Sequence, residues 1–146
     1  MAGNDSGALR EMVRILMRHL GILEKSDLSC CGVTLAQCHA IVEIGRRGKI
    51  NLNDLADLLD VDKSTMSRTI NNLVESGLAA RDLDGADRRY VVIQLTEEGQ
   101  RFFERTEGSM ERYFQGVLSR IPEDKRDQVL ESLTLLTKAI GHERCC

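Results

Sequence analysis

The chain has 146 residues, of which 42% are hydrophobic and 29% charged, as is typical of one soluble globular domain with or without helical extensions. A single proline and the absence of tryptophan favour helices over a turn-rich β fold. The net charge of −3 excludes a general polycation but leaves room for a local basic surface that binds nucleic acid. No apolar run approaches the ~18 residues of a membrane span, and no signal-peptide pattern is present, so we expect a cytoplasmic protein without membrane contacts.

The N-terminal third predicts two helices joined by a loop. Residues 8–25 carry a wide apolar stripe at helical spacing, which predicts a helix covered on two sides. Residues 27–32 read as a loop. The second helix begins after Thr34, which forms a capping box with Gln37, and continues to Gly45.

The central stretch predicts a helix–turn–helix followed by a β-hairpin. The basic segment RRGKI reads as a connection to a short helix over 53–59. Asp62 caps a second helix over 63–76, and Gly77 ends it. The β-like runs LAARDL and YVVIQL flank the sequence DGADRR, which supplies the hairpin turn.

The C-terminal part predicts two further helices. Thr96 caps a long helix that extends to about Arg120, and Pro122 opens the last helix. The last helix has an apolar stripe made of Val129, Leu130, Leu133, Leu136 and Ile140.

This order of elements predicts a mainly α fold with a small β-hairpin wing, that is, a winged helix–turn–helix flanked by helices from both chain ends. We assign residues 1–33 to an N-terminal dimerisation helix and a thiol-bearing loop, and residues 34–99 to a DNA-binding domain. Residues 100–146 form C-terminal dimerisation helices and a Cys-Cys tail. Because the flanking helices are too apolar to stand alone, we expect a homodimer that presents two reading heads to DNA.

The chain resembles the MarR family of transcriptional regulators over residues 9–140. The resemblance is most specific in LADLLDVDKSTMSRTINNLVESGLAARDLDGADRRYVVIQLTEEG. The family pattern Asp-x-Arg, strand, Leu-Thr-x-x-Gly is present as Asp87, Arg89, Leu95, Thr96 and Gly99. The resemblance implies a homodimer that binds a palindromic double-stranded operator, usually as a repressor released by an effector.

The residues expected to contact DNA lie on the second helix of the motif and in the wing. Short hydroxyl and amide side chains let a helix approach base edges in the major groove, and its N-terminus favours a phosphate. The resemblance assigns a wing contact to Arg89, and Asp87 is expected to orient Arg89 by a charge-assisted hydrogen bond. The predicted contacts are Lys63, Ser64, Thr65, Ser67, Arg68, Asn72, Arg88 and Arg89. For Arg46, Arg47 and Arg81, phosphate contact and plain solvation both stay open.

The five cysteines suggest a sensor more than a disulfide framework, because their number is odd and a cytoplasmic protein keeps its thiols reduced. Three thiolates suit arsenic(III) or antimony(III), whereas zinc would need a fourth ligand. Thiol oxidation is a second sensing chemistry. The predicted ligands are Cys30, Cys31 and Cys38, with His39, His142, Cys145 and Cys146 as further candidates.

Other interpretations stay open beside the thiol sensor. Val33 and Cys38 occupy the positions of a hydrophobic staple, so Cys38 can also be a small apolar plug. The resemblance suggests a different effector, a lipophilic or phenolic ligand held between the dimerisation helices and the head. A winged helix can also dock a protein instead of DNA, although the basic wing tip argues against this. The sequence has no set of residues arranged for catalysis. Cys38 and His39 are consecutive, so their side chains point in different directions on a helix. We expect the protein to require no cofactor.

Overall fold

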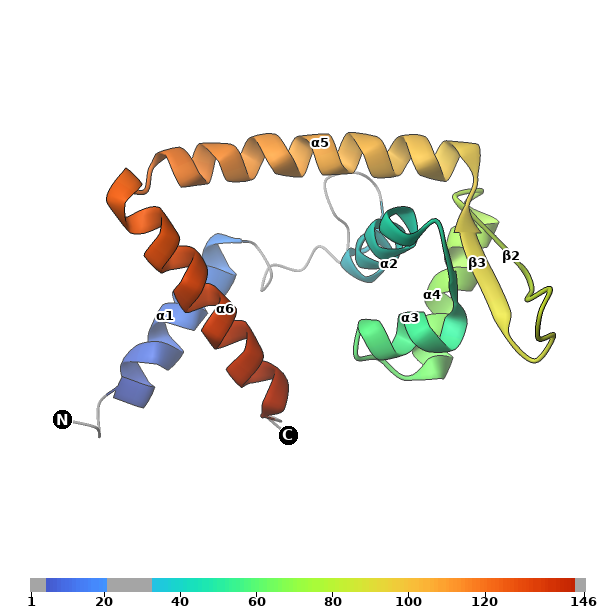
Figure 1. Ribbon diagram of the computed structural model, residues 1–146, viewed down its shortest axis with the longest axis horizontal. Coiled ribbons are helices and arrows are strands. Elements are labelled where there is room, and N and C mark those ends of the chain that lie inside the picture. The colour runs from blue at the N-terminus through green and yellow to red at the C-terminus, as the bar shows by residue number, and fades with distance from the viewer. Residues whose placement is uncertain (1–4, 21–32, 144–146) are drawn as a thin grey trace.

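The computed structural model describes residues 5–20 and 33–143, and within these ranges the protein is mainly helical with a three-stranded antiparallel sheet (Figure 1). The helices are α1 (Asp5–His19), α2 (Leu35–Arg47), α3 (Leu52–Leu58), α4 (Lys63–Glu75), α5 (Glu97–Ser119), the short 3₁₀ helix η1 (Glu123–Lys125) and α6 (Arg126–His142). The strands are β1 (Lys49–Asn51), β2 (Ala79–Leu83) and β3 (Val91–Leu95), in the sheet order β1-β3-β2. The predicted fold class is confirmed.

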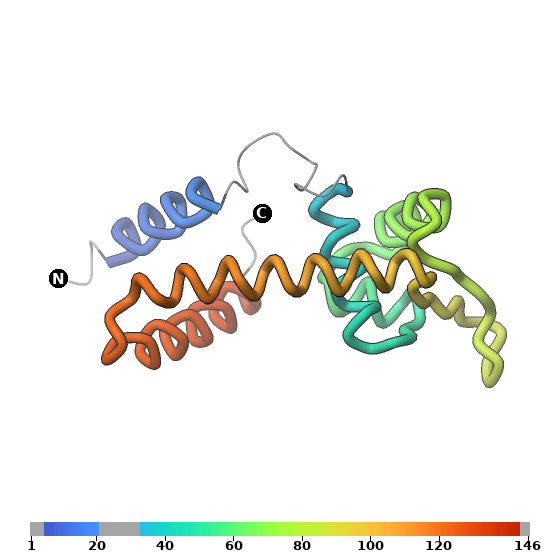
Figure 2. Tube along the Cα trace, turned by 90° about the horizontal axis from the view of Figure 1, so that it is seen from above, coloured from blue at the N-terminus to red at the C-terminus, as the bar shows by residue number. Residues whose placement is uncertain are grey.

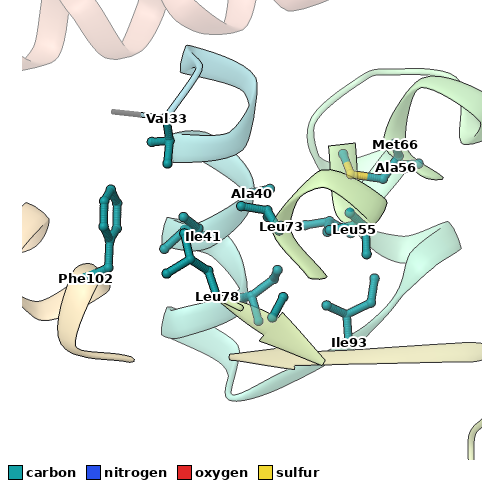
Figure 3. Close-up of a cluster of buried hydrophobic side chains, with 13 residues drawn as sticks. Val33, Ala40, Ile41, Leu55, Ala56, Met66, Leu73, Leu78, Ile93 and Phe102 are labelled. Carbon is teal, nitrogen blue, oxygen red and sulfur yellow. The ribbon is translucent and has the colours of Figure 1, made fainter. Parts of the chain in front are cut away.

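The head, defined as residues 33–99, has a single apolar core in which α2, α3 and α4 pack against the sheet (Figure 3). Its largest fully buried side chains are Ile41, Ile44, Leu55, Ile70, Leu73 and Ile93. Each such side chain contributes about 1.5–3 kcal/mol on leaving water, so the head is held together by contacts among its helices and sheet. This packing fixes which face of α4 points inward.

The predicted start signals of α2 and α4 and the predicted stop signal of α4 are confirmed. Thr34 accepts a hydrogen bond from the Gln37 backbone N–H at 3.1 Å, and the Gln37 side chain accepts one from the Thr34 N–H at 3.0 Å. Asp62 caps α4, and Gly77 follows that helix with a φ of 78°, a left-handed conformation that glycine adopts without steric cost. These caps set where α2 and α4 begin and where α4 ends.

Several element boundaries differ from the sequence-based prediction, including the end of α2, which runs past the predicted Gly45 to Arg47. The segment RRGKI is not only a connection, because Lys49–Asn51 forms β1 and pairs antiparallel with β3. A three-residue strand is too short to show an alternating pattern. Pro122 precedes the short helix η1, so α6 starts only at Arg126. The first helix, predicted over residues 8–25, is α1 and ends at His19. Residues 21–25 lie outside the described ranges.

The arm, defined as α1, residues 107–119 of α5 and α6, extends away from the head. Figures 1 and 2 show α1 and α6 near the end of α5 that is remote from the head. No residue of α1 or α6 is buried, although both helices carry large apolar side chains. The exposed apolar side chains of the arm include Leu9, Met12, Leu16, Met110, Tyr113, Phe114, Val117, Leu130, Leu133, Leu135 and Ile140.

A tight junction connects the head to α5. The Thr96 hydroxyl donates to the Gly77 carbonyl at 2.6 Å and accepts from the Gly99 N–H at 3.0 Å. The Thr96 N–H also donates to the Leu78 carbonyl at 3.1 Å. These bonds bring the first turn of α5 against the end of α4, so the direction of the arm is tied to the head.

Gly99→Ala tests how closely this junction is packed. A Cβ at Gly99 would lie 1.9 Å from the Leu78 carbonyl oxygen, so α5 must shift. We expect a loss of about 1–3 kcal/mol in the free energy of unfolding, measured by denaturant titration. Gly116→Ala in the same helix is the control, because its Cβ would meet no atom within 4 Å. Equal stability of the two variants would contradict the close approach.

Candidate nucleic-acid interface

The helix α4 presents a polar face opposite its buried side. Met66, Ile70 and Leu73 are buried in the core, so the residues between them point away from it. Of the predicted contact residues on α4, Thr65 and Ser67 are half-buried. The exposed ones are Lys63, Ser64, Arg68 and Asn72.

The N-terminus of α4 is organised by the carboxylate of Asp62. This carboxylate accepts from the Thr65 N–H at 2.6 Å and from the Ser64 hydroxyl at 2.9 Å. The hydrogen bonds with Thr65 and Ser64 favour the charged form and lower the pKa of Asp62 from 3.8 to about 2, with a further contribution from the positive charge of Arg68. The cap therefore holds the first turn of α4, and the hydroxyl groups on it, in place.

This lowered pKa predicts an acid dependence of stability. A carboxyl group whose pKa is depressed in the folded state stabilises the protein fully above its unfolded-state pKa, and this contribution is lost as the pH falls toward the folded-state pKa. In Asp62→Asn, which keeps a capping oxygen but does not titrate, the thermal midpoint should therefore fall less between about pH 4 and pH 2 than in the parent. Thermal unfolding at several pH values measures this. A constant difference between the two proteins across that window would contradict the assignment.

The wing is a hairpin between β2 and β3, and its tip is built by aspartates. The Asp84 side chain accepts from the Ala86 N–H at 2.9 Å, and the Asp84 N–H donates to the Tyr90 carbonyl at 2.9 Å. Asp87 then accepts from the Arg89 N–H at 3.0 Å. The turn thus places Arg88 and Arg89 on the exposed end of the hairpin.

Arg89 is held by the side chain of Asp87, in agreement with the prediction. The guanidinium donates from Nε to Oδ1 at 3.0 Å and from Nη2 to Oδ2 at 2.7 Å, a bidentate arrangement. These bonds lower the pKa of Asp87 and raise the pKa of Arg89. The Arg89 side chain is still 84% exposed, so the pair orients the guanidinium without covering it.

Three further arginines of the head have partners within the chain. Arg47 forms an ion pair with Glu43 in its own helix, and Arg46 lies 3.5 Å from Glu107 of α5. Arg81 of β2 donates a hydrogen bond to the side chain of Asn71 on α4. No sequence pattern indicated the contact with Asn71, since it depends on how β2 lies against α4.

Comparison with known proteins identifies this fold. The sequence profile of the MarR family matches residues 32–89, which include α2, the helix–turn–helix, and the first strand and tip of the wing. This match and the relatives below support a DNA-binding transcriptional regulator of MarR type with a winged helix.

Individual relatives agree with this assignment. The chain is 25% identical over 121 residues to the HTH-type transcriptional regulator BilQ of Clostridium symbiosum, covering 83% of this chain and 84% of that protein. The structure of Streptococcus pneumoniae FabT in complex with DNA has a TM-score of 0.82 at 19% identity, covering 93% and 97% of the two chains. A mutant MarR of Escherichia coli complexed with operator DNA gives 0.72 at 22% identity, covering 94% and 96%. At these identities the two structures support the fold alone.

The predicted thiol site falls largely on residues that the structure does not describe. Cys30, Cys31, Cys145 and Cys146 lie outside the described ranges. Cys38 lies in the first turn of α2 and packs against the same core as the buried Val33, which supports the staple interpretation, and His39 is exposed. Within residues 5–20 and 33–143, no three His, Cys, Asp or Glu side chains gather as metal ligands would. The metal site therefore stays a prediction.

The same ranges also bear on membrane contacts. No helix in the described part of the chain combines the length and the apolar character that crossing a bilayer requires.

Proposed function

We propose that this MarR-family protein is a homodimeric repressor that binds a palindromic operator through α4 and the wing. The observation that carries the proposal is the pairing of an exposed polar face on α4 with an exposed, pre-oriented Arg89 at the wing tip. A helix in the major groove and an arginine in the adjacent minor groove read neighbouring parts of one half-site. The proposed base and phosphate contacts are those named for α4 and the wing above.

The proposed occupant of the apolar arm is a second copy of the chain. A groove of about 1090 Å³ opens between α1, α5 and α6, and its lining includes Leu16, Phe114, Val117 and Leu133. The arm also exposes the large apolar side chains named above, and a contiguous exposed apolar surface marks an interaction site, so a partner is expected to cover it. A two-fold dimer buries the same surface on both copies and places two heads about one helical turn of DNA, ~34 Å, apart.

The operator can be found by selection from a pool of random DNA duplexes. We expect the enriched sequences to be inverted repeats and the affinity for them to fall steeply as salt increases, because phosphate contacts release counterions. A scrambled duplex of equal length is the control for sequence specificity. If no sequence is enriched and binding to any duplex is absent, the alternative of a protein-docking winged helix replaces the proposal.

Asp87→Ala gives a second, less intuitive test of the wing. Removing an acidic group should strengthen DNA binding if charge alone mattered. Because Asp87 holds Arg89 in a bidentate pair, we expect the affinity for the selected operator to fall about threefold to tenfold. Fluorescence anisotropy measures the affinity, and Asp82→Ala on β2 is the control that removes the same charge from the wing. Tighter binding by Asp87→Ala would contradict the orienting role.

For the effector we propose a thiophilic ion, arsenic(III), antimony(III) or zinc, or an oxidant, acting at Cys30, Cys31 and Cys38. Among the residues that the structure describes, the support is the position of Cys38 in the first turn of α2, seven residues after Cys31 in the sequence. Arsenite, antimonite, zinc and peroxide are titrated into the complex with operator, where release of DNA is expected. Cys30→Ser/Cys31→Ser should abolish this response, and Cys145→Ser/Cys146→Ser is the matched control. Release only by a lipophilic or phenolic compound would favour the other effector class.

A further inference from the structure

Arg81 lies where the wing strand meets the recognition helix. In the register of the sheet, Arg81 pairs with Ile93 of β3, which in turn pairs with Ile50 of β1. Directly paired residues of antiparallel strands point to the same face of the sheet. The Ile93 side chain is fully buried under the helices. The Arg81 side chain therefore leaves the backbone on this inner face of the sheet, and its end reaches the surface.

From this position Arg81 contacts α4 directly. Its Nη1 donates a hydrogen bond to the Oδ1 atom of Asn71, one turn before the end of the helix. Arg81 also lines a small cavity of about 140 Å³ together with Ser67 and Ile70 of α4. The side chain therefore bridges β2 and α4 on the side where Ser67 is a predicted DNA contact.

We propose that Arg81 is a positioning residue for operator recognition, which fixes the wing relative to α4 through its hydrogen bond to Asn71. The proposal rests on the proposed function, since it presumes that α4 and Arg89 both contact DNA. The tip of the wing lies at the far end of β2 and β3 from Arg81. A small rotation of this hairpin at Arg81 therefore displaces Arg89 from the groove that it is proposed to contact. Two contacts on one rigid body reinforce each other more strongly than two contacts on loosely linked bodies, because less conformational freedom is lost on binding.

A double-mutant cycle on operator affinity tests the proposal. Asn71→Ala and Arg81→Gln should each weaken binding about tenfold, and the variant with both changes should bind no more than about twofold more weakly than either, because a single bond is lost. Asn71→Ala should leave the salt dependence unchanged, since no phosphate contact is removed. Arg101→Gln, which removes one charge from a pair with Glu97 inside α5, is the control.

The Arg88→Ala/Arg89→Ala background separates positioning from a general structural effect. Without Arg88 and Arg89 the wing has neither of its proposed contacts to align, so Asn71→Ala should then change the affinity by less than about twofold. A loss that persists at full size in that background would overturn the proposal. So would parental binding by Asn71→Ala combined with a weaker salt dependence in Arg81→Gln, which would make Arg81 a direct phosphate contact.

Failure of the proposed function and failure of the positioning role give different results. If Arg88→Ala/Arg89→Ala binds the operator like the parent, the wing contact of the proposed function is wrong and the role of Arg81 fails with it. If Arg88→Ala/Arg89→Ala weakens binding but Asn71→Ala does not, only the positioning role is overturned. Circular dichroism on each variant confirms that the helices are formed before its affinity is compared.

Discussion

The variant Arg68→Ala/Arg89→Ala should bind the selected operator about a thousandfold more weakly than the parent. Each head loses one contact from α4 and one from the wing, and about 1 kcal/mol for each of four contacts in the dimer multiplies to this factor. Both side chains are exposed, so the free energy of unfolding should change by less than about 0.5 kcal/mol per chain. Fluorescence anisotropy and thermal unfolding measure the two quantities.

The matched control for this loss is Arg101→Ala/Arg105→Ala, which removes the same charge from exposed positions of α5. We expect that control to lose no more than a few-fold in affinity, because α5 is not among the elements proposed to contact DNA. Parental affinity in Arg68→Ala/Arg89→Ala, or an equal loss in the control, would mean that net charge governs binding and that α4 and the wing do not.

Val117→Asp/Leu133→Asp should convert the protein to a monomer and abolish tight operator binding. Both side chains line the apolar groove of the arm and are about half-exposed in the single chain. Burying four carboxylates in a dimer interface without partners costs more than the apolar contacts can offset. A single head loses the increase in affinity that arises when two linked heads bind one operator together, a factor of about 10²–10⁴.

Sedimentation velocity and operator titration measure these effects. Glu131→Gln/Lys138→Gln, at exposed polar positions of α6, is the control and should remain dimeric. The head should stay folded in the aspartate variant, because its core lies apart from the groove. A persistent dimer would place the interface elsewhere on the molecule.

The elements of the head could be predicted because the signals for them involve residues that are close together in the sequence. A cap such as Asp62 needs only the backbone N–H groups of the next turn, and the inward face of α4 follows from helical spacing. The pair between Asp87 and Arg89 is also local, two residues apart in one turn. Such features can be inferred without knowing the tertiary packing.

Features that depend on distant segments could not be predicted in the same way. β1 exists because β3 provides hydrogen-bond partners, and three residues carry no pattern of their own. The contact between Arg81 and Asn71 spans ten residues and requires the register of the sheet against α4. The close approach of Gly99 to Leu78 likewise follows from the junction of α5 with the head.

Two copies of α4 and the wing, joined by the arm, are proposed to read two half-sites of one operator. Sedimentation equilibrium of the protein with the selected operator, and with a half-operator of equal length whose second half-site is scrambled, tests this most directly. We predict two chains on the full operator, with half-sites centred about 10 base pairs apart, and binding at least about a hundredfold weaker to the half-operator. One chain per duplex, bound equally tightly to both DNAs, would contradict the proposal.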